Sequence, residues 1–256
     1  MVMLTIINLY SLRLHLTTIY RYSRASLIQQ LHGVSSDACT CAQHSPTLDI
    51  MEHIAMEVFY RESGTVYQKD FALEANGGTI VRSLTSDSSW LSEFIGDKPP
   101  ELTIREGMQV GQCWMLRSAS GQLGLSLSTP IHLTNITIIH IPPFMAFEEG
   151  QAPKEMILWG ILDGTDNVRR HQTSNDTSFA QSNGPPVAGG YSYVQLARFT
   201  YNVLSKNRAQ TFAIEPAIAK AGVDFGIVVL EVKSNWGARN TCLYRVQIHG
   251  EPVVYH

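Results

Sequence analysis

The sequence predicts an all-β fold, an antiparallel β-sandwich of the jelly-roll type that is preceded by a short amphipathic helix. Short apolar or alternating runs recur from residue 70 onward, and residues that favour turns separate them. No long helical pattern lies between these runs, which argues against a parallel α/β sheet. We expect strands at residues 102–105, 123–127, 133–141, 156–162, 194–201, 210–214, 225–232 and 243–249.

Residues 1–47 precede the predicted domain, and we expect them to be poorly ordered. Residues 1–20 are apolar and β-branched, but Arg13 and His15 interrupt them, so a cleaved signal peptide fits poorly. A mitochondrial presequence and a misassigned or truncated start remain as alternatives. Residues 35–47 are rich in Ser, Thr, Cys and Pro and predict a linker.

Residues 48–65 have helical spacing, with Ile54, Val58 and Phe59 on one side. We expect this short helix to lead into one domain over residues 66–256. Within that domain, residues 163–193 are rich in Asn, Ser, Gly and Pro and predict a long exposed loop between two strands.

Composition excludes several classes of function. The formal net charge is −3, which gives no basic field for nucleic acid. No apolar run reaches the roughly 20 residues that a spanning helix needs, so we expect membrane association only through segments not evident in this chain. Nucleophile-elbow, zinc-protease, P-loop and dinucleotide motifs are absent from the sequence, and Glu148-Glu149 indicates a solvated loop, so we expect no enzyme. Asn135 and Asn175 begin glycosylation sequons.

The stretch 234–252 predicts a turn, a last strand and a stop. Asn235 and Gly237 suit the turn, and Gly250 and Pro252 would end the ladder. Alternation predicts a half-buried strand, with one face formed by Tyr244, Val246 and Ile248. From the residues alone, Cys242 at the start of this strand is equally well a buried free thiol.

Residues 241–252, Thr-Cys-Leu-Tyr-Arg-Val-Gln-Ile-His-Gly-Glu-Pro, resemble the C-terminal signature of SUN domains. These are the luminal domains of nuclear-envelope bridges that bind KASH peptides. Three upstream motifs resemble the same family in the same order: Asp70-Phe71-Ala72-Leu73 with Gly77-Gly78, Gly111-Gln112-Cys113-Trp114, and His140-Ile141-Pro142 with Ala152-Pro153-Lys154. The resemblance runs from about residue 62 to the C-terminus, and it implies the same β-sandwich that the strand pattern predicts independently.

The resemblance implies a disulfide between Cys113 and Cys242. Two separate reduced thiols are the alternative, expected if the domain is cytosolic.

The resemblance also implies a loop that binds a monovalent cation, K⁺ or Na⁺, mainly through backbone carbonyls. Its ligand positions fall on Leu102, Arg105, Gly107, Gln112 and Tyr244. Gly107 stands where the family usually has an acidic residue, and Arg105 adds a positive charge nearby. An ordinary glycine-containing hairpin loop is the alternative.

The partner site implied by the resemblance holds the terminal carboxylate of a KASH peptide at His140, Gln151 and Asn240. Asn240 replaces the usual tyrosine and Gln151 stands near a usual serine, although both can still donate hydrogen bonds. From the residues alone, an edge histidine with a structural partner is the favoured interpretation of His140.

The lid that pairs with the peptide in the family corresponds to residues 82–101, which are fewer than in animal homologues. Trp90 and Phe94 there are candidate contact residues, with packing onto the sandwich as the alternative. Thr85-Ser86-Asp87 occupies the region of the lid cysteine, so no covalent link to a partner is expected.

The resemblance therefore implies an inner nuclear membrane protein of the LINC complex, with its domain in the perinuclear or endoplasmic-reticulum lumen. It would assemble as a homotrimer through an upstream coiled coil, bind a KASH-type C-terminus and link the nucleus to the cytoskeleton. The alternative from another class is a luminal jelly-roll module for glycan binding or quality control.

Overall fold

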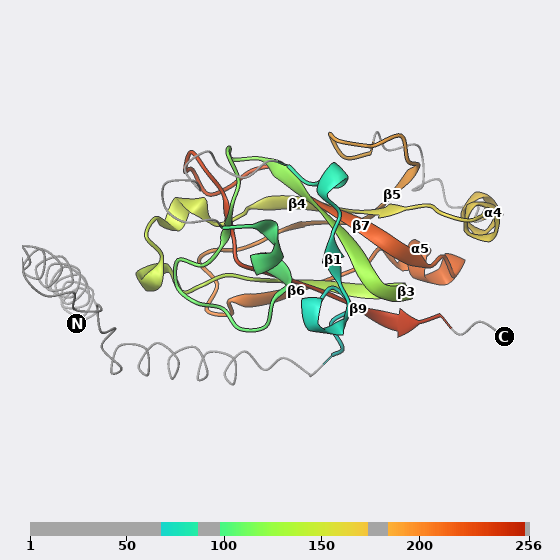
Figure 1. The fold of residues 1–256 in the computed structure, drawn as a ribbon, viewed down its shortest axis with the longest axis horizontal. Helices are drawn as coiled ribbons and strands as arrows, with labels where there is room; N and C mark the ends of the chain where they lie inside the picture. Colours follow the sequence, from blue (N-terminus) through green and yellow to red (C-terminus); the bar gives the residue numbers. More distant parts are fainter. Residues whose placement is uncertain (1–67, 87–97, 174–183, 254–256) are drawn as a thin grey trace, which may run out of the picture. The chain divides into compact units, whose positions relative to one another are not determined.

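The computed structural model describes residues 68–86, 98–173 and 184–253, and strands dominate this part of the chain (Figure 1). The strands are β1 Thr79–Ile80, β2 Trp114–Met115, β3 Gly121–Ile139, β4 Glu155–Ile161, β5 Tyr193–Thr200, β6 Ala209–Ala213, β7 Phe225–Val232, β8 Cys242–Leu243 and β9 Arg245–Pro252. The predicted all-β class is confirmed. The expected N-terminal segment, the helix at 48–65, Trp90 and Phe94 lie outside the described residues.

Short helical turns connect the strands. They are the 3-10 turns η1 Glu74–Asn76, η2 Arg82–Leu84, η3 Pro100–Ile104, η4 Pro143–Met145 and η5 Glu149–Gln151, and the α-helices α4 Thr165–Thr173 and α5 Pro216–Ala221. Among the described residues, no helix is long and apolar enough to cross a membrane.

Strand β3 takes part in both layers of the sandwich. Its first half pairs with β7 from Gly121 to Ser126, and a register shift separates this ladder from the pair Ile131–Phe225. Pro130 lies within the shift, where the missing proline N–H breaks no ladder hydrogen bond. The second half then pairs with β6 on one side and β9 on the other. Two predicted strands, 123–127 and 133–141, are therefore one strand that changes layer.

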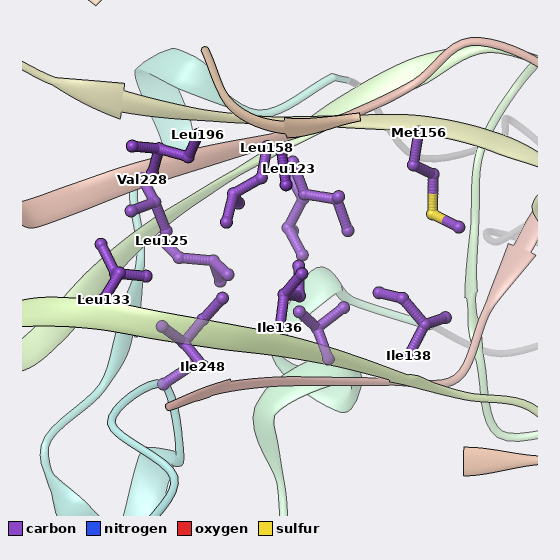
Figure 2. Packing of buried hydrophobic residues seen from close by; sticks show 14 of the residues in the cluster. Leu123, Leu125, Leu133, Ile136, Ile138, Met156, Leu158, Leu196, Val228 and Ile248 are labelled. Atoms are coloured by element: carbon purple, nitrogen blue, oxygen red, sulfur yellow. The ribbon is translucent and has the colours of Figure 1, made fainter. Parts of the chain in front are cut away.

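The first layer has the strand order β1-β3-β7-β4-β5, and the second consists of β6, the second half of β3, and β9. Apolar side chains from the two layers point toward one another and form the core (Figure 2). The first layer contributes Leu123, Leu125, Leu158, Leu196 and Val228, and the second contributes Leu133, Ile136, Ile138 and Ile248. Burial of each such side chain is worth about 1.5–3 kcal/mol, so this interface holds the layers together.

The strand predicted at 102–105 is wrong, because this segment forms the 3-10 turn η3. Pro100 presets the backbone at the start of the turn, and the Thr103 hydroxyl donates to the Pro100 carbonyl at 2.7 Å.

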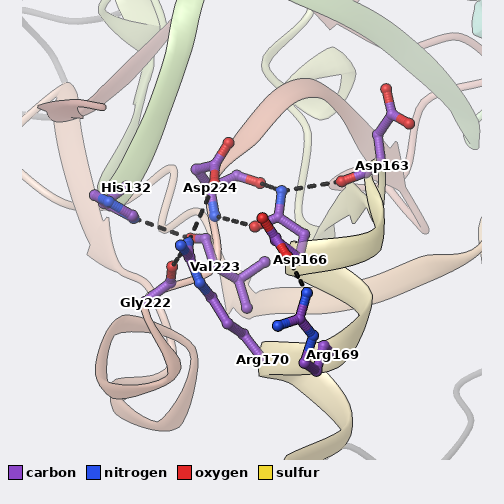
Figure 3. Close-up of polar contacts among 9 residues, drawn as sticks. His132, Asp163, Asp166, Arg169, Arg170, Gly222, Val223 and Asp224 are labelled. Atoms are coloured by element: carbon purple, nitrogen blue, oxygen red, sulfur yellow. Dashed lines mark hydrogen bonds and ion pairs between the residues drawn. The ribbon is translucent and has the colours of Figure 1, made fainter. Parts of the chain in front are cut away.

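The loop predicted at 163–193 contains the helix α4, which the polar composition concealed. The buried Asn167 side chain donates to the carbonyls of Asp163 and Asp224, both at 3.0 Å. Arg170 donates to the Gly222 carbonyl at 2.9 Å, which joins α4 to the turn after α5 (Figure 3). Polar contacts, rather than an apolar stripe, therefore fix this helix.

The last strand is buried on both faces, and the half-buried strand predicted here is wrong. Arg245 and His249 are buried, because the segment before η1 covers them. The pairing also continues past Gly250 to Pro252, which pairs with Ile131. The predicted end of the ladder is therefore confirmed at Pro252, where β9 ends, and is wrong at Gly250.

That covering segment forms what we call the N-terminal clamp: Asp70, Phe71, Arg245 and Ile248. Asp70 Oδ2 accepts a hydrogen bond from Arg245 Nη2 at 2.6 Å, and Oδ1 accepts from the Ile248 amide at 3.1 Å. The Phe71 amide donates to the Ile248 carbonyl at 2.8 Å. The clamp thus fixes the start of the domain to its last strand.

Candidate functional site

The disulfide implied by the resemblance to SUN domains is present. Cys113 and Cys242 are separated by 129 residues, and their Cα atoms lie 5.5 Å apart. The two-stranded sheet β2–β8 holds them in place, since Met115 pairs with Cys242 and Trp114 with Leu243. Both half-cystines are buried among Met108, Ile139, Ile141 and Tyr244. The bridge therefore ties the loop at 105–112 to the last strands.

The structure brings Tyr244 against this loop. The Gly111 amide donates to Tyr244 Oη at 3.1 Å, and Gly107 and Gly111 have φ of 74° and 79°. Left-handed backbone of this kind is accessible to glycine without strain. Four of the expected cation positions, Leu102, Arg105, Gly107 and Gln112, thus lie on one segment that contacts the fifth, Tyr244.

The charge of Arg105 is directed away from this loop. Its Nε donates to Glu74 Oε2 at 2.9 Å, and both side chains are exposed. Among the described residues, no group of three His, Cys, Asp or Glu side chains could hold a metal. A cation here would therefore depend on carbonyl oxygens, and the K⁺ or Na⁺ site stays a prediction.

His140 lies just beyond the end of β3 and is 3% exposed. Its Nδ1 lies 3.1 Å from the Ile141 carbonyl. Because a carbonyl can only accept, Nδ1 carries the proton and Nε2 presents a lone pair. Nε2 has no partner in hydrogen-bond geometry within the part of the chain that the structure describes. An unsatisfied buried polar atom of this kind is uncommon in a folded domain.

Aromatic rings enclose the imidazole. The Tyr244 ring meets it edge-on with centroids 4.9 Å apart, and the Tyr201 ring lies at 6.2 Å. Burial, with a smaller contribution from the positive charge of Arg208, lowers the pKa of His140 to about 4, although the backbone carbonyls of Ile141 and Cys242 oppose the shift. His140 is therefore neutral at neutral pH.

The structure does not join the other expected partner residues to His140 by any described contact. The side-chain amide of Asn240 donates from Nδ2 to the Leu116 carbonyl at 3.2 Å. Gln151 ends the turn η5 and is half-buried, and its amide N–H donates to the Glu148 carbonyl at 3.2 Å. The side chain of Asn240 is thus already engaged, and the roles of Gln151, Asn240 and His140 in partner binding stay predictions.

Two residues near His140 were missed by sequence reasoning, Tyr201 and Arg208. The His140 amide donates to the Arg208 carbonyl at 3.3 Å, one step beyond the ladder pair Ile139–Ala209. The Tyr201 hydroxyl donates to the same Arg208 carbonyl at 3.0 Å, and burial raises the pKa of Tyr201 to about 12. Only the pairing of β3 with β6 places Tyr201 and Arg208 beside His140, and no local sequence motif predicts that pairing.

An exposed aromatic side chain lies on the same loop as the expected partner residues. Phe147, between η4 and η5, is 95% exposed, whereas Met145 and Ala146 before it pack against the disulfide cluster. A single exposed phenylalanine is common on protein surfaces and by itself needs no explanation.

The chain matches a protein family and several known proteins. The family model described as "Sad1 / UNC-like C-terminal" matches residues 94–252. Human SUN domain-containing protein 5 is 25% identical over 256 residues, which cover 94% of this chain and 59% of that protein. Mouse sperm-associated antigen 4 protein is 29% identical over 213 residues, or 78% of this chain and 42% of that protein. Human SUN domain-containing protein 1 is 28% identical over 197 residues, or 72% of this chain and 22% of that protein.

This chain therefore spans less than two thirds of the length of these relatives. Among solved structures, the family 32 carbohydrate-binding module from Streptococcus pneumoniae EndoD superposes with a TM-score of 0.47 at 10% identity, over 72% of this chain and all of the module. That similarity is too low to support an argument about function. The family model covers more than half of the chain, and the protein belongs to the Sad1/UNC-like family, the family of SUN domains.

Proposed function

We propose that this protein is a SUN-domain protein of the nuclear envelope that captures the C-terminal tail of a KASH-type partner in the perinuclear lumen. Its role is structural rather than enzymatic, and it links the nucleus to the cytoskeleton. The observation that carries the proposal is the buried His140, whose Nε2 has no described partner, at the end of the sandwich that the disulfide fixes. Family membership supports the class of partner.

The disulfide supports the compartment. Disulfides persist in oxidising compartments such as the endoplasmic-reticulum lumen, with which the perinuclear space is continuous, and are rare in the cytosol. A bridge between Cys113 and Cys242 therefore favours a luminal domain.

The environment of His140 supports recognition of a chain end. An unsatisfied buried nitrogen costs about 1–3 kcal/mol, and a partner group that fills the position would recover this cost on binding. A peptide terminus is a small group that carries the hydrogen-bonding atoms such a nitrogen lacks. The proposed binding mode combines capture of this terminus with strand addition to a lid segment.

The assembly that we propose is a homotrimer held by an upstream coiled coil. Light scattering of the chain, alone and fused to a trimeric coiled coil, measures whether the partner-binding state requires three copies.

A duplicate peptide array tests the proposed function. Random-sequence decapeptides are attached through their N-termini, with free carboxylates on one array and amidated C-termini on the other. We expect the full 256-residue chain to select free-acid peptides, with a loss of at least about tenfold on amidation, the value of one charge-assisted hydrogen bond. His140→Gln should weaken binding, whereas the control His132→Gln, whose ring contacts the Val223 carbonyl in a different part of the fold, should not (Figure 3). Equal binding to both arrays would contradict the proposal.

A further inference from the structure

Arg208 lies directly across the antiparallel pair from His140. The His140 amide donates to the Arg208 carbonyl at 3.3 Å, and the adjacent residues Ile139 and Ala209 form the last pair of the β3–β6 ladder. Side chains that are directly opposite in an antiparallel pair share a face, with Cβ atoms about 4.5–5.5 Å apart. The two side chains therefore start from neighbouring positions on the same face, and the Arg208 charge is close enough to lower the pKa of His140.

The charge of Arg208 has no carboxylate within ion-pair distance among the described residues. Five other arginines in the described ranges do form such pairs: Arg82 with Glu101, Arg105 with Glu74, Arg169 with Asp166, Arg170 with Asp224, and Arg245 with Asp70. Arg208 is half-buried and instead donates from Nη1 to the Val203 carbonyl at 2.5 Å. That contact orients the guanidinium but does not neutralise its charge, and a guanidinium has five N–H donors.

The imidazole and the guanidinium are suited to different groups of a ligand. His140 donates from Nδ1 to the Ile141 carbonyl, so its Nε2 is an acceptor and cannot donate to a carboxylate. The titratable or charged groups around the ring are Tyr201, Tyr244 and Arg208, and none of them is an acid that would favour its protonation. A carboxylate at this end of the molecule therefore requires another cation, and an arginine binds a carboxylate through two parallel hydrogen bonds.

We propose that Arg208 is the carboxylate-binding residue of this site, and that neutral His140 accepts a hydrogen bond from an N–H or O–H group of the same terminal residue. This inference rests on the proposed function, because it assigns the groups that recognise the chain end. It names the ligand class as a peptide with a free C-terminal carboxylate and a donor group beside it. Asn240 stands where the family usually has a tyrosine, and in this proposal Arg208, which directly precedes β6, supplies the carboxylate contact instead.

The experiment compares four forms of the full chain on the paired arrays: wild type, Arg208→Ala, Arg208→Lys and Arg198→Ala. Arg198 is the matched control, since it is exposed on β5 opposite Ile157 and loses the same charge. We expect Arg208→Ala to lose the preference for free acids, by roughly tenfold or more, and Arg208→Lys to keep part of it. Arg198→Ala should retain the wild-type preference. Thermal melting of each variant establishes that it is folded. If Arg208→Ala does not fold, the reduced preference of Arg208→Lys for free acids tests the proposal in its place.

The pH dependence of the preference for free-acid peptides distinguishes Arg208 from His140 as the residue that binds the carboxylate. If Arg208 holds the carboxylate, the wild-type preference for free acids persists from pH 6 to pH 8, because arginine stays charged over this range. If a protonated His140 holds it, the preference weakens steadily as the pH rises, and the proposal is overturned. A wild type that prefers free acids together with an unchanged Arg208→Ala also overturns the proposal while the proposed function stands. A wild type with no preference overturns both.

Discussion

The Asp70 carboxylate of the N-terminal clamp and the imidazole of His140 are both buried and polar, but their hydrogen-bonding atoms are satisfied to different degrees. In the clamp, both carboxylate oxygens of Asp70 accept hydrogen bonds, from Arg245 and from the amides of Ala72 and Ile248. At the site, His140 uses one ring nitrogen and leaves the other without a described partner. The first arrangement ties the start of the domain to its last strand, whereas the second leaves one buried nitrogen without a described partner.

This difference distinguishes buried polar residues that stabilise the fold from a buried polar residue that we expect to bind a partner. Burial of a charge is tolerated when its partners are complete, and removal of one partner then leaves an uncompensated charge. An atom left unsatisfied contributes nothing to stability and costs about 1–3 kcal/mol. We therefore expect clamp substitutions to reduce stability, and site substitutions to reduce binding more than stability.

The largest expected effect tests the covalent link that fixes the site end of the molecule. Replacement of Cys113 and Cys242 by serine opens a loop closed across 129 residues. Chain entropy predicts a loss of about 4–5 kcal/mol in the free energy of unfolding, measured by urea denaturation. The wild type with and without reductant provides the internal comparison. A loss below about 1 kcal/mol would show that the disulfide does not hold this end.

The next largest effect is expected from a substitution that disrupts the N-terminal clamp. Asp70→Ala leaves the buried Arg245 charge without its carboxylate and should cost about 3–5 kcal/mol. The matched control is Glu74→Ala, which removes an exposed ion pair with Arg105 and should cost at most about 1 kcal/mol. Selection of free-acid peptides, measured on folded protein at low temperature, should be retained. Equal destabilisation by the two variants would refute the distinction between clamp and surface.

Acid should destabilise the protein through His140. Its pKa is 6.5 unperturbed and about 4 in the folded protein, so the unfolded chain binds the proton more readily between these values. The contribution to stability is therefore complete above pH 6.5 and is lost as the pH falls toward 4, by about 3 kcal/mol in total. His140→Gln should flatten the stability profile in this window relative to the His132→Gln control. Parallel profiles for the two variants would contradict the buried neutral imidazole.

The smallest expected effect is the loss in the free energy of unfolding that His140→Gln causes at pH 8. Because Nε2 has no described partner, the substitution should cost only about 1 kcal/mol, the value of the contact with the Ile141 carbonyl. Denaturation at pH 8 measures this value beside that of Asp70→Ala. A loss of stability equal to that of Asp70→Ala would mean that His140 stabilises the fold rather than binding a partner.

Much of the fold followed from alternation in the sequence. Strands β4, β5, β6 and β7 lie within about two residues of their predicted ranges, because their inward side chains are apolar and turn residues flank them. The 3-10 turn at Pro100 and the helix α4 were missed because local polar contacts, rather than periodicity, fix them. The burial of Arg245 and His249 was missed because the segment that covers them lies more than 170 residues away in sequence.

The site was predicted only in part. The pair Cys113–Cys242 followed from the resemblance to SUN domains and is present in the structure. His140 was selected on the same basis, but its unsatisfied nitrogen is a property of packing. Arg208 could not be found, because only the strand register brings it beside His140.

The most direct test of the central claim is the ¹⁵N and ¹H NMR signal of the His140 ring in the full chain, with and without the tightest free-acid decapeptide from the array. We predict that the free protein at pH 7 shows a neutral ring protonated at Nδ1, and that saturating peptide shifts the Nε2 resonance of His140 while leaving His132 unchanged. A His140 ring whose resonances do not move at saturation would contradict the account.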